Sequence, residues 1–205
     1  MLFILTGDVQ TGKTRWLESL IDSLNENGVS AQGVLAPGVW RSGNDPDAVE
    51  EYVDENGFEK LGIDNVLLPD GKRIPFARRR DIAEEEGLLN PDAQREKAHW
   101  LGQIDEDAII KVNDHLASRP HPTAYSKRLL VIDELGRLEL LRGGGLVAAI
   151  NLLEQGPSAT FPHTLVIVRA ALLDEAKTRF PLWGEPTLIY PDCKSADQVL
   201  TAFID

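Results

Sequence analysis

The chain has 205 residues, of which 42% are hydrophobic, and its formal net charge at pH 7 is −12. This length suits one domain, and the hydrophobic content is enough for a packed core, so a disordered chain is excluded. Surfaces that bind duplex nucleic acid are normally basic, so we do not expect nucleic acid as a partner.

Cysteine and histidine usage excludes several kinds of site. The single cysteine, Cys193, permits no internal disulfide, and the four histidines lack the spacing of metal ligands. No basic leader precedes the short N-terminal apolar run, and no stretch approaches the length of a membrane span. We therefore expect a cytoplasmic protein that does not contact the membrane.

The first part of the chain predicts the beginning of a parallel α/β sheet. The apolar run at 2–5 is typical of a buried strand. After Thr14, apolar residues repeat on one face as far as Leu24, which predicts a helix that ends at Asn27-Gly28. A second strand is expected at 29–35, so the order is strand, glycine loop, helix, strand.

The middle of the chain predicts an excursion at about residues 40–80. Residues 43–60 are acidic and weakly periodic, which is typical of a solvent-exposed insertion with at most a short helix. The turn sequence Pro69-Asp70-Gly71 separates two apolar runs and predicts a β-hairpin. The triplet Arg78-Arg79-Arg80 is either a solvated surface or a basic edge that contacts a nucleotide or a partner.

The second half of the chain continues the alternation of strands and helices. Asp105 is suited to cap a helix, and a linker at 118–126 leads to an apolar strand at 129–132. Ser195 and Gln198 have the spacing of a capping box at the start of a terminal helix. Further strands are expected at 165–168 and 187–190, and further helices at 146–153 and 172–180.

The stretch GDVQTGKT, from Gly7 to Thr14, matches the P-loop pattern G-x-x-x-x-G-K-[ST] between a predicted strand and a predicted helix. Its glycines let backbone N–H groups surround a phosphate, and the helix dipole favours the negative charge. We expect Lys13 to reach the β- and γ-phosphates, Thr14 to bind Mg²⁺, and the Asp8 side chain to point away or cap the loop. The predicted nucleotide-binding residues are Gly7, Asp8, Val9, Gln10, Thr11, Gly12, Lys13, Thr14 and Arg15.

A second motif follows the apolar strand at 129–132. A P-loop requires a carboxylate at the end of a neighbouring strand to hold Mg²⁺, and Asp133 has that place. Glu134 comes next and is suited to polarise a water for in-line attack on the γ-phosphate. The predicted metal ligands are therefore Thr14 and Asp133, and the predicted catalytic residues include Lys13 and Glu134.

The segment VIDELGRLEL, from Val131 to Leu140, resembles the DEIG-[KR]-x-EL signature of the nucleoside-triphosphatase family first described in thermophiles, which has cancer-related nucleoside-triphosphatase relatives. The order of P-loop, Gly33-Val34 strand, hairpin and signature is also similar. The resemblance implies one P-loop α/β domain over residues 1–205, with a mainly parallel central sheet flanked by helices on both faces. It also implies slow, Mg²⁺-dependent hydrolysis of several nucleoside triphosphates, ATP or GTP among them, to diphosphate and phosphate.

Arg169 ends the apolar run at 165–168, where a residue that senses the γ-phosphate would lie. We count it among the predicted catalytic residues, although a surface arginine at a strand end is an equal alternative. Arg137 and Glu139 belong to the family signature. A structural ion pair that supports the turn after the strand is one interpretation of these two residues, and catalysis is another.

Three functions are compatible with these motifs. The first is a nucleoside-triphosphatase, and Glu134 beside Asp133 favours it because the pair can activate water. The second is a small-molecule or nucleotide kinase, for which Arg78-Arg79-Arg80 would supply a lid. The third is a nucleotide-dependent switch or accessory protein, with the acidic segment 43–60 as the surface for a protein partner.

Overall fold

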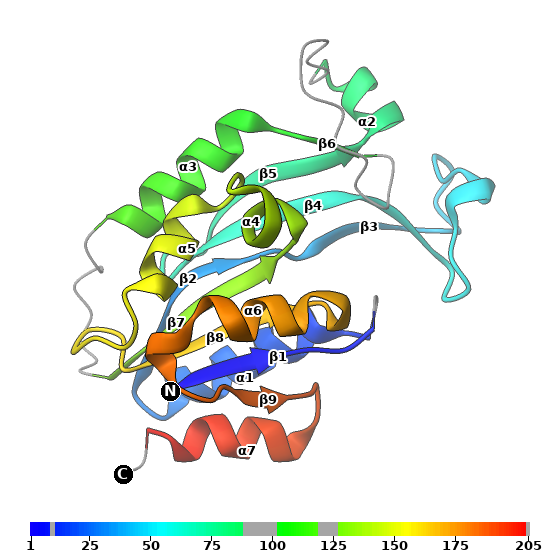
Figure 1. Cartoon of the computed structure of the whole chain (residues 1–205). Helices are drawn as coiled ribbons and strands as arrows, with labels where there is room; N and C mark the ends of the chain where they lie inside the picture. The colour runs from blue at the N-terminus through cyan, green and yellow to red at the C-terminus, as the bar shows by residue number, and fades with distance from the viewer. Residues whose placement is uncertain (9–10, 88–101, 119–126, 204–205) are drawn as a thin grey trace.

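The computed structural model describes residues 1–8, 11–87, 102–118 and 127–203 and shows a twisted sheet between two layers of helices (Figure 1). None of the helices in these ranges has the length and apolar character needed to cross a bilayer. The strands are β1 (Leu2–Leu5), β2 (Val29–Leu35), β3 (Gly38–Ser42), β4 (Phe58–Leu68), β5 (Lys72–Arg79), β6 (Gly102–Ile104), β7 (Lys127–Leu135), β8 (His163–Val168) and β9 (Thr187–Ile189). The helices are α1 (Lys13–Glu26), α2 (Arg80–Glu85), α3 (Glu106–Ala117), α4 (Arg137–Arg142), α5 (Val147–Glu154), α6 (Leu173–Arg179) and α7 (Cys193–Thr201), with short 3₁₀ turns η1 (Glu50–Tyr52), η2 (Ala170–Leu172) and η3 (Pro181–Trp183).

The sheet has a parallel half and an antiparallel half. Its strand order is β6-β5-β4-β2-β7-β8-β1-β9, and β3 pairs with β4 outside this path. The strands β2, β7, β8, β1 and β9 run parallel, so their C-terminal ends meet at one edge. Beyond β2 the pairing of β4, β5, β6 and β3 is antiparallel. The predicted hairpin is therefore longer than expected and continues the central sheet.

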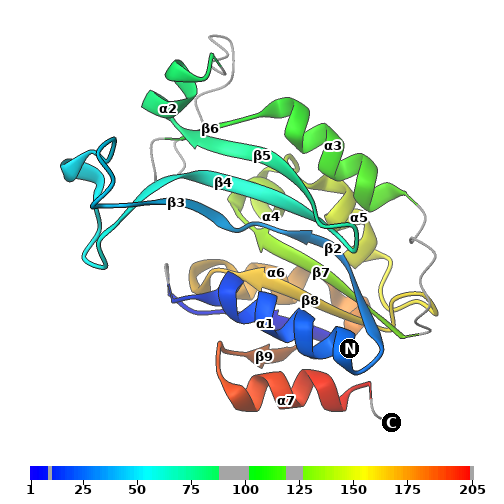
Figure 2. The ribbon, with the colours of Figure 1, turned by 180° about the vertical axis from the view of Figure 1, so that it is seen from behind.

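Apolar side chains on both faces of the sheet form two cores. Along β1, Leu2 and Ile4 belong to the core with α3, α4, α5 and α6, whereas Phe3 and Leu5 belong to the core with α1 and α7. All four side chains are buried, because successive residues of a strand point to opposite faces and both faces are covered. Figure 2 shows α1 across the face opposite to α5 and α6. The predicted α/β fold class is thus confirmed.

The approach of β2 to β7 depends on Gly33. Its φ is +124°, and a Cβ at this position would lie 2.0 Å from the backbone oxygen of Val131. Glycine alone tolerates both the positive φ and this contact. The close pairing holds the end of β2 beside the end of β7, where the second sequence motif lies.

Of the two N-terminal helix caps predicted from the sequence, one is present in the structure and one is not. Asp105 caps α3 as predicted, since its side chain accepts the backbone N–H of Asp107. The capping box predicted at Ser195 is wrong, because Asp192 is the N-cap of α7 and accepts the Ser195 N–H at 2.7 Å. The Ser195 hydroxyl instead accepts the N–H of Tyr190. Residues 119–126 of the predicted linker lie outside the described residues.

Two residues of the arginine triplet, Arg78 and Arg79, form ion pairs with carboxylates of β4. Arg79 is 7% exposed and donates to the fully buried carboxylate of Glu59 at 2.6 Å. Arg78 is largely buried and donates to Asp64 at 2.8 Å. Arg80 is exposed. For Arg78 and Arg79 both predicted alternatives, a solvated surface and a basic edge, are therefore wrong, because their charges are neutralised within the sheet.

Candidate functional site

The predicted P-loop connects β1 to α1 at the C-terminal edge of the parallel strands (Figure 1). Gly7 and Gly12 have φ of +145° and +80°, which favours glycine at both positions. The Lys13 Nζ folds back over the loop and donates to the backbone carbonyls of Gly7, at 3.1 Å, and of Asp8. The Lys13 ammonium is therefore held against the main chain of the loop. Val9-Gln10 lies outside the described residues.

Several residues of the predicted P-loop are exposed, and one of them, Asp8, contacts its neighbours through its main chain. Asp8, Thr11 and Arg15 are all exposed. The Thr11 hydroxyl donates to the Asp8 backbone carbonyl at 3.0 Å, so the loop is closed through the Asp8 main chain. Burial lowers the pKa of Lys13, whereas the charges of Glu134 and Asp8 raise it. The Asp8 carboxylate is thus close enough to interact with the Lys13 ammonium.

Asp133, at the end of β7, lies beside the first turn of α1. It is 3% exposed, its Oδ2 accepts the backbone N–H of Ala36 at 3.0 Å, and it is hydrogen-bonded to the Thr14 side chain. Burial raises the pKa of Asp133 to about 6, and the two hydrogen bonds oppose that rise. The structure thus brings together the two predicted metal ligands.

This pair of side chains fits a hard divalent cation. Hydroxyl and carboxylate oxygens are the ligands that Mg²⁺ takes, and Mg²⁺ commonly uses one or two protein ligands together with substrate phosphates. Among the residues described, no group of three or more His, Cys, Asp or Glu side chains could hold a metal. A dication beside Asp133 would favour the charged form of a carboxylate that burial disfavours.

Glu134 and Arg169 form an ion pair at the ends of β7 and β8. The Arg169 Nε donates to the Glu134 carboxylate, and the two side chains are 45% and 30% exposed, respectively. The register between the two strands shifts between Ile132 and Leu135, and this irregular stretch contains both acidic residues of the motif. Asp133 is thereby buried, whereas Glu134 reaches solvent.

Lys60 is a further cation near the site that sequence reasoning missed. It lies on β4 and is half-buried. Burial lowers the pKa of its ammonium, while the charge of Glu134 raises it and that of Arg169 lowers it. Lys13 experiences the same two charges. No sequence signal points to Lys60, because a lysine at the end of the acidic segment 43–60 has the local pattern of a solvated residue.

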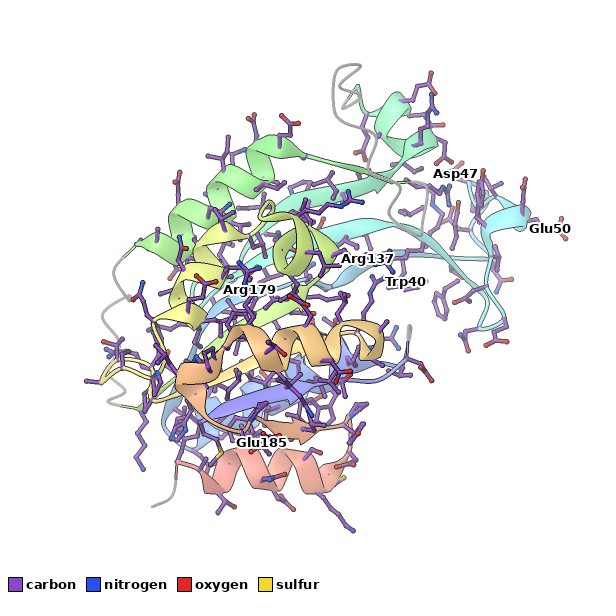
Figure 3. All side chains as sticks on the ribbon, viewed as in Figure 1. Trp40, Asp47, Glu50, Arg137, Arg179 and Glu185 are labelled. Carbon is purple, nitrogen blue, oxygen red and sulfur yellow. The ribbon has the colours of Figure 1, made fainter. Side chains whose placement is uncertain are left out.

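The signature after Glu134 forms the start of α4. The Glu139 carboxylate is buried and accepts the backbone N–H groups of Gly136, at 2.9 Å, and Leu146, at 3.2 Å. Arg137, labelled in Figure 3, is exposed. The Glu139 carboxylate contacts these main-chain N–H groups, so the structure does not support the interpretation of the two residues as an ion pair. Arg179 instead donates to the backbone carbonyl of Glu139 at 3.2 Å. Glu139 therefore stabilises the turn through its main-chain contacts.

Comparisons with known proteins agree with this architecture. No family model matches the chain, and no curated protein matches its sequence. The fold is similar to that of a human cancer-related nucleoside triphosphatase, with a TM-score of 0.57 and 21% identity over 99% of this chain and 94% of that chain. It is also similar to THEP1 from the hyperthermophile Aquifex aeolicus, with a TM-score of 0.55 and 15% identity over 98% and 96% of the two chains. At these identities the comparison demonstrates a shared fold.

Proposed function

We propose that the chain is a Mg²⁺-dependent nucleoside-triphosphatase that hydrolyses a nucleoside triphosphate to the diphosphate and phosphate. The observation that carries this proposal is the contact between Thr14 of the P-loop and the buried Asp133 of β7, with Lys13 and Glu134 at the same edge. A protein of similar fold is a human nucleoside triphosphatase, which supports the choice of reaction. We expect the reaction to take place in the cytoplasm.

Each residue of the proposed site has a separate role in transferring the phosphoryl group to water. Lys13 and the backbone N–H groups of the P-loop bind the β- and γ-phosphates. Thr14 and Asp133 hold Mg²⁺, which when bound neutralises charge on the phosphates and stabilises the transition state. Glu134 accepts a proton from the attacking water. The water oxygen forms a bond to the γ-phosphorus, and the bond to the β,γ-bridging oxygen breaks with its electron pair leaving on the diphosphate.

Arg169 has two tasks in this scheme. Its ion pair with Glu134 holds the carboxylate at the sheet edge. Once a triphosphate is bound, its guanidinium stabilises the negative charge on the transferring phosphoryl group. All of these assigned residues act on phosphates, metal or water, so we expect ATP, GTP, CTP and UTP to be hydrolysed at comparable rates. The kinase alternative has lost support, because Arg78 and Arg79 are engaged in ion pairs within the sheet.

Phosphate release tests the proposal directly. With Mg²⁺, the parent protein should release phosphate from all four triphosphates, and Lys13→Ala should release none. Glu134→Gln should still bind ATP but lose at least about 100-fold in turnover, as expected for removal of a general base. Glu26→Gln, at the exposed far end of α1, makes the same chemical change away from the site and should match the parent.

Two results would reject parts of this assignment. Parent-like phosphate release by Glu134→Gln would show that another group accepts the proton. Nucleotide binding by the parent without release from any triphosphate would reject the hydrolase and favour a partner-dependent switch.

A further inference from the structure

The ribbon of β3 and β4 begins directly beside the predicted metal ligand. The backbone N–H of Ala36, immediately after β2, bonds to Asp133, and β3 begins at Gly38. Because β2 is parallel to β7, the chain that leaves β2 emerges at the edge where the P-loop lies. Figure 1 shows β3 and β4 continuing past the end of β2. The ribbon therefore supplies side chains to the site from the antiparallel half of the sheet.

Trp40 and Lys60 are cross-strand partners in this ribbon. They are paired in the β3–β4 register, next to an irregularity between Val39 and Trp40. A Cβ at Gly38 would lie 2.4 Å from the Trp40 Nε1, so the indole is packed against the Gly38 main chain. The Lys60 Nζ lies 5.6 Å from the centre of the indole ring. This packing and the cation–π contact restrict where the Lys60 ammonium can go.

Lys60 and Lys13 are influenced by the same two charged residues. Both lysines are partly withdrawn from water, and both interact with Glu134 and Arg169. Lys13, Lys60 and Arg169 thus form a group of cations at one edge of a protein whose net charge is −12. A group of cations at one edge of an acidic protein is suited to bind an anion. A γ-phosphate is such an anion, and it would lie near Lys13 and Arg169 in the proposed reaction.

We propose that Lys60 binds the γ-phosphate of the bound triphosphate, and that Trp40 positions it there. This inference rests on the proposed nucleotide site and deepens it. A diphosphate bound in the P-loop lacks the γ-phosphate and does not engage Lys60. The site therefore discriminates between triphosphate and diphosphate through a residue that lies outside both nucleotide motifs, and product release is favoured after hydrolysis.

Binding measurements on Lys60→Met test this inference. The change removes the charged Nζ and keeps an unbranched apolar side chain that is one atom shorter. By calorimetry with Mg²⁺, the affinity for a β,γ-methylene ATP analogue should fall about 10-fold to 100-fold, as for loss of a charge-assisted hydrogen bond, and the affinity for ADP should change less than about 2-fold. Lys60→Arg should recover most of the lost affinity. Lys72→Met, an exposed lysine at the start of β5, is the matched control and should leave both affinities unchanged.

Trp40→Leu tests the positioning role with the same readout. It should lower the affinity for the triphosphate analogue more than that for ADP, by a smaller factor than Lys60→Met. An equal loss for both nucleotides, or no loss for either, in Lys60→Met would overturn the proposal. The ratio of the affinities for the triphosphate analogue and for ADP does not depend on turnover. A parent protein that binds the analogue without hydrolysing ATP would reject the proposed hydrolase, and the affinity ratio of Lys60→Met would still decide this inference. A parent that binds neither nucleotide would overturn both.

Discussion

Replacing Asp133 with asparagine should stabilise the metal-free protein at neutral pH. Burial raises the pKa of Asp133 from 3.8 to about 6. A difference of this size corresponds to about 3 kcal/mol of unfavourable free energy in the charged form. Asparagine removes the charge but forms weaker hydrogen bonds with Ala36 and Thr14, so we expect a net gain of about 1–2 kcal/mol in the free energy of unfolding.

The gain should depend on pH in a direction fixed by the pKa shift. The folded protein holds the Asp133 proton up to about pH 6, whereas the unfolded chain releases it near pH 4. Between these values the unfolded state binds fewer protons, so the contribution of Asp133 to stability falls as pH rises. The advantage of Asp133→Asn should therefore be absent at pH 4 and complete above pH 7.

Urea denaturation followed by circular dichroism, in the presence of a chelator at pH 4, 5.5 and 7.5, measures this difference. Asp22→Asn, on the exposed face of α1, controls for the loss of one carboxylate and should show no gain. Mg²⁺ with a triphosphate analogue should stabilise the parent and have little effect on Asp133→Asn, because ligand that binds the folded state raises its stability. A gain of equal size at all three pH values, or no gain at pH 7.5, would refute the reasoning.

Three further substitutions test how the fold supports the site, each by the urea midpoint. Gly33→Ala should cost more than about 3 kcal/mol or prevent folding, because the added Cβ would meet the backbone oxygen of Val131 at 2.0 Å with a φ of +124°; a cost below about 1 kcal/mol would contradict the close strand approach. Glu59→Gln should cost about 2 kcal/mol, since it weakens a buried contact with Arg79 that a second carboxylate still satisfies in part; adding Arg79→Met should recover stability. Glu139→Leu should cost about 2–4 kcal/mol by leaving one buried and one partly buried N–H group without an acceptor, and Glu139→Gln should cost less; equal costs would show that volume rather than hydrogen bonding matters.

The sequence by itself determined the features that depend on neighbouring residues. The glycine-containing loop between β1 and α1 could be predicted because its glycines, its lysine and its threonine lie close together in the sequence, between an apolar strand and a periodic helix. The apolar strands and α1 were clear for the same reason, since burial on both faces of a parallel strand leaves a continuous apolar run. The placement of Asp133 at the edge shared with Thr14 followed from its position after such a run.

Only the tertiary structure decided which distant residues share that edge. Lys60 approaches Glu134 because β4 pairs with β3, and β3 continues from the end of β2. Arg79 is buried because Glu59, from the neighbouring strand, receives its charge. Neither neighbour is apparent in the sequence, because a charged residue has the same local pattern whether it is solvated or paired. Strand pairing determines which residue lies beside the charged side chain, and that neighbour determines the free energy of burying the charge.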